Sequence, residues 1–530
     1  MRSAELDAYL ASIPRGNGFE AFFEEYGVNY RWMALGAVVL GNLVALLAVT
    51  MINVAVPAVM GAFGVGQDQA QWLATGNLAA STMAMLVCRW FTDRYGLRNL
   101  MLLAMALFFV GSLLGGIATN FEVMIIARIM QGITAGLLAP MAMTMIFQLF
   151  PPGKQGLAMG LSALGIILAP ALGPTLGGVL VDEFNWRYVF LLGVPVSLIG
   201  IPAAISFLPE RVEGKARPFD YLGFTLLTVS VTSMLVAITN GQRFGWESNY
   251  VTSMTAIAIV FAIWFVYSQS RVTYPLMNIS LFRIPQFLTM SIFAFALSAG
   301  LYGSTYLIPL VIQLVQHQTP TQAGLLMMPA GLAMAISFPL IGKLSDSVSH
   351  IKLITIGTLG FAWSFWLMGG IDERTSFWTL AIWVLISRVS MSLVNTPTQI
   401  SALADVPPQQ LADASGAFSF MRQVGGAFGV NVMAQVLEYR RTYHSDYLLS
   451  TQTWDNSYSV EIIQMLRGLS HRFGVEGNDQ WAFAYQGLGG MIQQQALIAA
   501  FKDSFMIVAV AFALLLLMVL RISKPNNKTK

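Results

Sequence analysis

Residues 160–180 read GLSALGIILAPALGPTLGGVL, and this apolar stretch decides the fold. About 20 helical residues at a rise of 1.5 Å each cross the hydrocarbon core of a bilayer, so the stretch can span a membrane. Small residues let two helices approach closely in lipid, and prolines bend a membrane helix where neighbouring helices satisfy its backbone. Both residue types recur here at helical spacing, namely Gly165, Ala169, Gly173, Gly177 and Gly178 with Pro170 and Pro174. The stretch therefore predicts a bent membrane helix that packs closely against a partner.

The composition is that of a membrane protein. The chain has 530 residues, of which 56% are hydrophobic and 10% are charged. Soluble proteins carry about 25% charged residues, so we expect much of this surface to face the lipid bilayer. A formal net charge of +3 without a basic, aromatic patch argues against nucleic acid as a partner. One cysteine, Cys88, and four dispersed histidines predict neither an internal disulfide nor a metal site.

Apolar runs of spanning length recur about fourteen times along the chain. They lie near 32–57, 70–90, 99–119, 122–147, 157–181, 187–208, 220–240, 251–270, 288–314, 321–342, 351–370, 376–402, 414–437 and 503–521. Lysine and arginine gather in alternate short loops and in the C-terminal tail. Because cytoplasmic loops carry an excess of these residues, the pattern predicts a multi-pass membrane protein with both termini in the cytoplasm.

A weak internal repeat divides the chain. GKLSDSVSHIK at 342–352 echoes RWFTDRYGLR at 89–98, and each follows an apolar run. Duplicated halves are typical of secondary transporters, which bind their substrates between the halves. We therefore expect an all-α polytopic protein with a cytoplasmic tail over 1–30, a six-helix half over 31–208, two extra helices over 209–270, a second six-helix half over 271–522 and a cytoplasmic tail over 523–530.

One connection is long and polar. Residues 439–502 separate the last two apolar runs and are expected on the outer side of the membrane. Ser459, Ile462, Leu466, Leu469 and Phe473 follow helical spacing, and 481–501 is apolar enough for a second helix. Two interpretations remain open: a surface hairpin that caps the mouth of a transporter, or a docking surface or gate.

Several stretches resemble the fourteen-span drug:proton antiporters of the major facilitator superfamily, the EmrB/QacA type. They are TMINVAVP at 50–57, DRYGLR at 93–98, RIMQG at 128–132, GPTLGG at 173–178, NWRYVFLLGVP at 185–195 and SFMRQVGGAFG at 419–429. The resemblance implies a major facilitator fold, with two six-helix halves and two extra helices between them. It also implies export of small amphipathic compounds with the proton gradient as energy source and no cofactor. A periplasmic membrane-fusion adaptor and an outer-membrane channel are the implied partners. Pro170, Gly173, Pro174, Gly177 and Gly178 then form the antiporter motif of the fifth helix.

The loop after the second span predicts a conformational latch. Asp93, Arg94 and Arg98 can form charge-assisted hydrogen bonds at the cytoplasmic surface, with Gly96 between them. A solvated ion pair of little energetic value is the alternative. We favour the latch because the echo in the second half retains an acid, Asp346.

Arg128 lies within the fourth span, with Gln131 on the same helical face. A guanidinium at membrane depth is costly unless it meets a partner or a wet cavity, which favours a role in proton or substrate coupling. The alternative is that Arg128 extends to the outer interface, close to Glu122.

The first span lacks the acid that the family pattern LDxTIVNVALP would place in it, because Ala48 stands at that position. None of the acids of the chain falls in the middle of a predicted span. Glu122, Asp182 and Glu183, at span ends, are therefore the candidate proton carriers. Arg128 and Arg388 without a fixed counter-charge predict a cavity that favours anionic or neutral amphiphiles over lipophilic cations. The alternative is that Arg128 pairs with Glu122 and Arg388 faces an outer vestibule, which leaves the charge of the cargo open.

Further polar residues interrupt the spans and are candidates for the substrate cavity: Asn53, Asn77, Arg388, Asn395 and Arg422. Single amides in membrane helices more often join helices than bind ligands. Two alternatives to multidrug export are also open, namely transport of one anionic metabolite in either direction and a membrane sensor that transports nothing. The motif of the fifth helix argues against an importer. No nucleophile with a neighbouring base is visible in the sequence, so we do not expect an enzyme.

Overall fold

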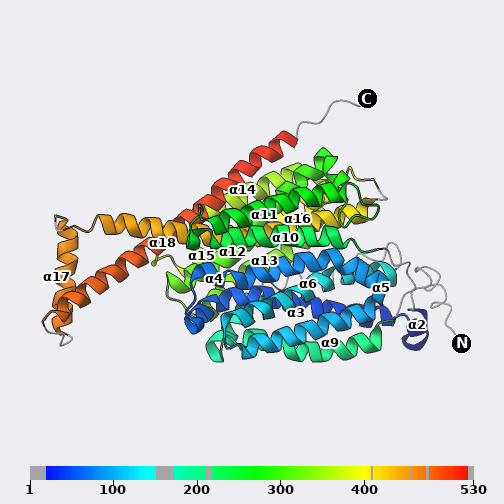
Figure 1. The fold of residues 1–530 in the computed structure, drawn as a ribbon, viewed down its shortest axis with the longest axis horizontal. Helices are drawn as coiled ribbons and strands as arrows, with labels where there is room; N and C mark the ends of the chain where they lie inside the picture. Colours follow the sequence, from blue (N-terminus) through cyan, green and yellow to red (C-terminus); the bar gives the residue numbers. More distant parts are fainter. Residues whose placement is uncertain are drawn as a thin grey trace.

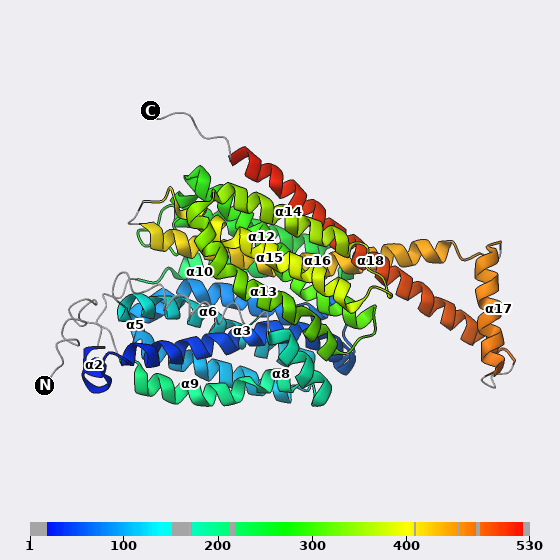
Figure 2. The ribbon, with the colours of Figure 1, turned by 180° about the vertical axis from the view of Figure 1, so that it is seen from behind.

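The computed structural model describes residues 19–150, 169, 172–210, 218–407, 410–453, 455–472 and 477–522. Over these residues the regular structure consists of helices alone. Most of them run side by side along the length of the molecule, and an arm projects from one end (Figures 1 and 2). We name this end the arm end, and the opposite end, where α2 (Glu20–Tyr26) lies, the α2 end.

The helices before residue 208 pass back and forth between these two ends. They are α3 (Tyr30–Phe63), α4 (Gln67–Ala70), α5 (Trp72–Ile117), α6 (Phe121–Leu149), an unlabelled helix over 172–183, α8 (Tyr188–Leu191) and α9 (Gly193–Phe207). α5 consists of two limbs that meet at a turn at Gly96, and each limb corresponds to one predicted span. Gly96 has a φ of 80°, which glycine adopts without steric cost, and this explains the glycine of the DRYGLR stretch.

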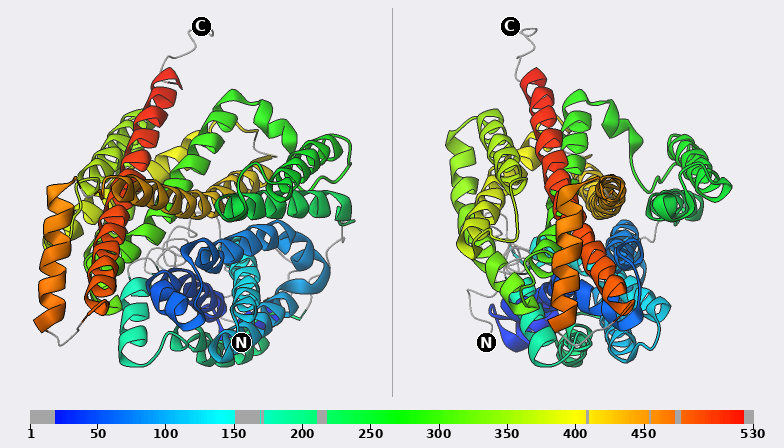
Figure 3. Two further views of the ribbon diagram at one scale, coloured as in Figure 1. Left: turned by 60° about the vertical axis from the view of Figure 1, so that its left-hand side comes forward. Right: turned by 90° about the vertical axis from the view of Figure 1, so that its left-hand side faces the viewer.

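Two helices, α10 (Tyr221–Phe244) and α11 (Asn249–Gln269), follow as a pair. They form the green pair at the right-hand edge of the right view in Figure 3. Beyond them lie a 3₁₀ turn, η1 (Ile279–Arg283), and α12 (Pro285–Leu314), α13 (Pro320–Ser347), α14 (His350–Met368), α15 (Phe377–Leu403), α16 (Leu411–Ser450), α17 (Ser457–Arg472) and α18 (Asp479–Ile522).

Eleven of the described helices are long and apolar enough to cross a membrane. Of the other predicted spans, 70–90 forms the first limb of α5 and 414–437 lies within α16. The span over 157–181 is described only at 169 and from 172 onward. The predicted fold class, an all-α polytopic membrane protein, is confirmed.

The long connection over 439–502 is helical over most of its described length and forms the arm. α16 runs on to Ser450, and α18 begins already at Asp479. No proline interrupts this part of the sequence, so the spanning helices continue beyond the membrane. α17 lies across the tip of the arm (Figure 1), where Ile463 and Leu466 pack with Leu488 and Ile492 of α18. The predicted helix around Ile462 and Leu469 is α17, whereas Phe473 lies outside the described residues.

Candidate functional site

Arg128 is the largest fully buried side chain that the structure describes, with 1% of its surface exposed. It lies in the second turn of α6 and donates three hydrogen bonds to neutral oxygens. Nε donates to the carbonyl of Leu73 at 2.8 Å, and Nη1 donates to the carbonyl of Ala48 at 3.0 Å and to Oε1 of Gln131 at 2.9 Å. One guanidinium thus joins α3, α5 and α6.

Further hydrogen bonds extend this junction. Gln131 donates from Nε2 to the hydroxyl of Ser112 at 3.1 Å, on the second limb of α5. Asn77, on the first limb, donates from Nδ2 to the carbonyl of Arg128 at 3.0 Å. The ring of Phe190 lies 6.0 Å from the guanidinium carbon, within cation–π range. The Arg128 network therefore connects most of the N-terminal helices into one body.

No carboxylate balances Arg128 among the described residues. Its Nη2 has no hydrogen-bond partner there, and neither Glu122 nor Asp182 forms an ion pair with it. Glu122 and Glu183 are exposed. The structure instead brings Arg128 to Ala48, the position at which the family pattern has an acid. An uncompensated cation in a membrane interior is costly, so this arrangement calls for a functional explanation.

Arg388 is the corresponding buried cation of the second half. It lies in α15 with 4% of its surface exposed. Nη1 donates to the hydroxyl of Ser304 at 3.3 Å, and Nη2 donates to the hydroxyl of Thr305 at 3.0 Å, both on α12. No ion pair of Arg388 occurs among the described residues. Each half therefore places one arginine against neutral oxygens of its first long helix.

The remaining cavity candidates are dispersed. Asn53 is buried in α3, and its Oδ1 has no hydrogen-bond partner among the described residues. Asn77 belongs to the Arg128 network, as described above. Asn395 in α15 and Arg422 in α16 are half-buried. None of these residues lines the cavity between α10 and α11 that is described below.

The glycines of the fifth helix face two different partners. A Cβ on Gly173 would collide with Thr50, and one on Gly177 would lie 2.8 Å from the carbonyl of Met51, so both face α3. Gly178 instead lies directly against the backbone of Pro320 at the start of α13. Pro170 lies outside the described residues.

Helix 172–183 and α13 meet backbone to backbone across the two halves, and we name this contact the arm-end seam. Gly178 packs on Pro320, and reciprocally Gly324 packs on Pro174. Thr175 donates from its hydroxyl to the carbonyl of Gly324 at 3.0 Å. The small residues are needed because any side chain on Gly178 or Gly324 would overlap the partner backbone.

Other side chains also hold the halves together at the arm end. Gln67 donates from Nε2 to the hydroxyl of Tyr306 at 2.8 Å, and Gln313 donates to the carbonyl of Val54 at 3.1 Å. Asp182 accepts a hydrogen bond from the backbone N–H of Thr321 at 2.7 Å. Gln67, Tyr306, Gln313 and Thr321 were not predicted as site residues. Gln67, Gln313 and Thr321 are polar residues near the ends of apolar runs, whereas Tyr306 lies inside one.

A second set of bonds joins the halves along α5 and α16. Asn431 donates to the hydroxyl of Thr75 at 3.1 Å, and Gln423 donates to the hydroxyl of Ser81 at 2.7 Å. Asn431 also accepts from Thr239 of α10 at 2.6 Å, so the inserted pair is fastened to the same contact. Among pairs of fully described residues, no hydrogen bond between the halves lies closer to the α2 end than the one from Gln423.

The predicted latch is described only in part. The side chains of Asp93 and Asp346 lie outside the described part of the structure. Arg94 is exposed, and its guanidinium carbon lies 5.5 Å from the centre of the Trp90 ring. Arg98 forms an ion pair with Glu210 at 3.0 Å, a partner that the sequence did not suggest.

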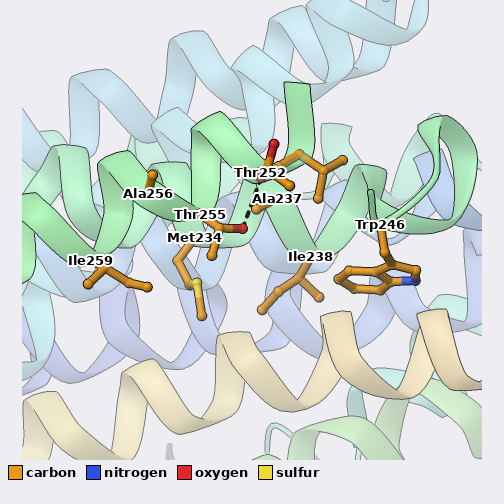
Figure 4. A pocket seen from close by; sticks show the side chains of 9 residues that line it. Met234, Ala237, Ile238, Trp246, Thr252, Thr255, Ala256 and Ile259 are labelled. Atoms are coloured by element: carbon orange, nitrogen blue, oxygen red, sulfur yellow. Dashed lines mark hydrogen bonds between the residues drawn. The ribbon is translucent and has the colours of Figure 1, made fainter. Parts of the chain in front are cut away.

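An apolar cavity of about 480 Å³ lies between α10 and α11 (Figure 4). Met234, Ile238, Trp246 and Ile259 contribute side chains to it, and no lining residue is charged. None of the lining residues belongs to α6 or α15, so this cavity is separate from both buried arginines. The described residues contain no group of acids, histidines or cysteines that could hold a metal ion.

Residues 38–430 match the Major Facilitator Superfamily. The multidrug export protein EmrB of Haemophilus influenzae is 29% identical over 93% of this chain and 96% of its own. The fatty acid resistance protein FarB of Neisseria gonorrhoeae is 27% identical over 94% of this chain and 97% of its own. The multidrug export protein EmrB of Escherichia coli (strain K12) is 26% identical over 91% of this chain and 93% of its own.

Solved structures show the same fold at low identity. A POT family transporter in complex with a thioalcohol-conjugated peptide superposes with a TM-score of 0.64, at 14% identity, over 97% of this chain and 100% of its own. A bacterial homologue of the lysosomal transporter Spinster, in an inward-facing conformation, gives a TM-score of 0.61 at 16% identity, over 92% of this chain and 96% of its own. The chain is a transporter, not an enzyme, and belongs to the Major Facilitator Superfamily, in its EmrB type.

Proposed function

We propose that the protein exports small amphipathic compounds across the inner membrane in exchange for protons, with the proton gradient as its energy source. The observation that carries this proposal is the closure of the two halves at the arm end. Four hydrogen bonds and the close contacts of the arm-end seam join the halves there, and among pairs of fully described residues no hydrogen bond between the halves lies nearer the α2 end than the one from Gln423 to Ser81. Closure at one end is what alternating access requires of one of its two states.

The arm end faces the periplasm in this proposal. Loops rich in lysine and arginine then lie at the α2 end, in the cytoplasm, as the positive-inside rule requires. The structure is accordingly a state whose periplasmic end is sealed. Export is favoured over import because relatives of closely similar length are named for multidrug export.

The two buried arginines indicate the charge of the cargo. Arg128 and Arg388 are both buried, and both donate only to neutral oxygens among the described residues. A cargo anion that approached either one would relieve an unbalanced charge in a low-dielectric interior. A relative named for fatty acid resistance fits an anionic amphiphile. We therefore favour anionic or neutral amphiphiles over lipophilic cations, with exposed acids at the arm end, Glu122, Asp182 and Glu183, as proton carriers.

The arm provides a surface for a further partner. Tyr443, Tyr447 and Tyr458 expose 52%, 60% and 77% of their surface, and Met465 exposes 54%. Exposed aromatic and methionine side chains are enriched at protein interfaces. A periplasmic adaptor that leads to an outer-membrane channel is the partner we propose for this surface.

The test is transport in everted membrane vesicles with and without a proton gradient, using an anionic amphiphile and a cationic dye. We expect accumulation of the anionic compound in vesicles that carry the parent protein, and its loss when the gradient is collapsed. Accumulation that ignores the gradient would contradict proton coupling. Transport of neither compound, with one anionic metabolite transported instead, would favour the narrower alternative.

A further inference from the structure

We propose that Asp182 is a positioning residue of the periplasmic gate, because it completes the N-terminal cap of α13 from the opposite half of the protein. Oδ2 of Asp182 accepts the backbone N–H of Thr321 at 2.7 Å. Asp182 lies in the last turn of helix 172–183, and Thr321 lies in the first turn of α13. The bond therefore fastens one half to a helix terminus of the other.

The first turn of α13 leaves one donor for such a bond. Pro320, at the first helical position, has no N–H. Thr319 and Gln322 form a reciprocal capping box, in which the N–H of Gln322 is bound by the Thr319 hydroxyl and the N–H of Thr319 by the Gln322 side chain. Ala323 donates to the carbonyl of Thr319. Thr321 is the remaining N–H of this turn, and Asp182 accepts from it.

The electrostatics favour an acid at this place. The first turn of a helix carries a partial positive charge, which stabilises a carboxylate beside it. The next helical turn of the same contact is the arm-end seam, where Gly178 touches Pro320. A movement that separates Gly178 from Pro320 must also draw Thr321 away from Asp182, because the residues are neighbours on both helices. Breaking the cap and opening the seam are thus parts of one movement.

The cap is thus expected to bias the gate toward its closed state. Because Asp182 is exposed, the bias is modest, and its loss should raise the ratio of open to closed molecules about two- to fivefold. The inference rests on the proposed transport cycle, but its test reads conformation and needs no transported compound.

The experiment is a distance measurement between spin labels in nanodiscs. Labels at Ile117→Cys and Glu373→Cys, in a Cys88→Ala background, sit on exposed sites at the arm ends of the two halves. Asp182→Ala removes the acceptor, and Asp182→Asn keeps an acceptor oxygen without the charge. Glu247→Ala removes an exposed acid of the loop between α10 and α11, and Thr321→Ala keeps the backbone donor, so both are matched controls.

We expect the population of long distances to rise with Asp182→Ala, to rise less with Asp182→Asn, and to match the parent in both controls. Unchanged distances in folded, monodisperse Asp182→Ala would overturn the proposal. An equal rise in Glu247→Ala would also overturn it, because the effect would then be one of net charge. A parent that transports nothing in vesicles would instead count against the proposed function, and the spin-label result would stand apart from it.

Discussion

The guanidinium of Arg128 donates from Nη1 to the backbone carbonyl of Ala48 at 3.0 Å. The sequence has an arginine inside one span and lacks an acid in another. The structure places these two positions next to each other. Nη2 of the same guanidinium has no partner among the described residues. An acid at position 48 would be next to this charge, and the chain carries alanine there.

We therefore expect Ala48→Asp to change the choice of cargo. A carboxylate beside Arg128 would neutralise it, since a charge-assisted bond in this interior is stronger than one to a neutral oxygen. Export of an anionic amphiphile should fall and export of a cationic dye should rise, measured side by side in everted vesicles. Ala48→Asn, which adds similar bulk without charge, is the control. If both variants alter export equally, bulk and not charge is responsible.

Removal of the arginines gives a complementary prediction. Arg128→Ala and Arg388→Ala should each weaken export of the anionic amphiphile, because each removes a buried cation that is balanced by no acid among the described residues. Arg128→Ala should also lower the melting temperature, since it breaks three hydrogen bonds, two of them between helices, each worth about 1 kcal/mol. Arg374→Ala, in an exposed loop, is the control. A parent that prefers the cation, with anion export unaffected in both variants, would contradict the proposed cargo charge.

The close packing of the fifth helix predicts that leucine is not tolerated there. Gly173→Leu and Gly177→Leu would push this helix away from α3, because overpacking a tight contact costs about 1–3 kcal/mol. We expect export to fail while the protein still inserts into the membrane. Gly36→Leu is the control, since nothing lies within 4 Å of a Cβ at that position. Normal export by both the Gly173→Leu and the Gly177→Leu variant would refute the packing argument.

The sequence predicted the helices well, because the thickness of the bilayer sets the length of each apolar run that spans it. The sequence did not predict where α16 ends or where α18 begins. Hydropathy falls at the membrane surface, but α16 continues beyond it to Ser450, and α18 begins before it at Asp479. The sequence predicted a partner for the small residues of the fifth helix but not that there are two, α3 and α13. Contacts between the halves, such as Gln67 with Tyr306, join residues far apart in the chain and follow from the fold alone.

The arm gives the last prediction. Arg440 and His444 of α16 both bind Asp503 of α18, and Gln494 of α18 reaches the end of α12, so the base of the arm is fixed to the transporter body. Among the described residues, its tip is joined to the body through α16 and α18 alone (Figures 1 and 2). Substitutions at the tip should therefore leave the transport machinery intact.

Tyr447→Asp with Tyr458→Asp places two charges on exposed aromatic positions of the arm, where a docked partner would have to desolvate them. We expect cells that carry this double variant to lose resistance to a toxic amphiphile, whereas everted vesicles, which need no adaptor, transport it at the parent rate. Tyr250→Asp, on an exposed site at the start of α11, is the control and should retain resistance. Deletion of 455–495 should give the same contrast more severely. Equal loss of vesicle transport in the double variant would mean that the arm belongs to the transport machinery, because a docking surface acts only where a partner is present.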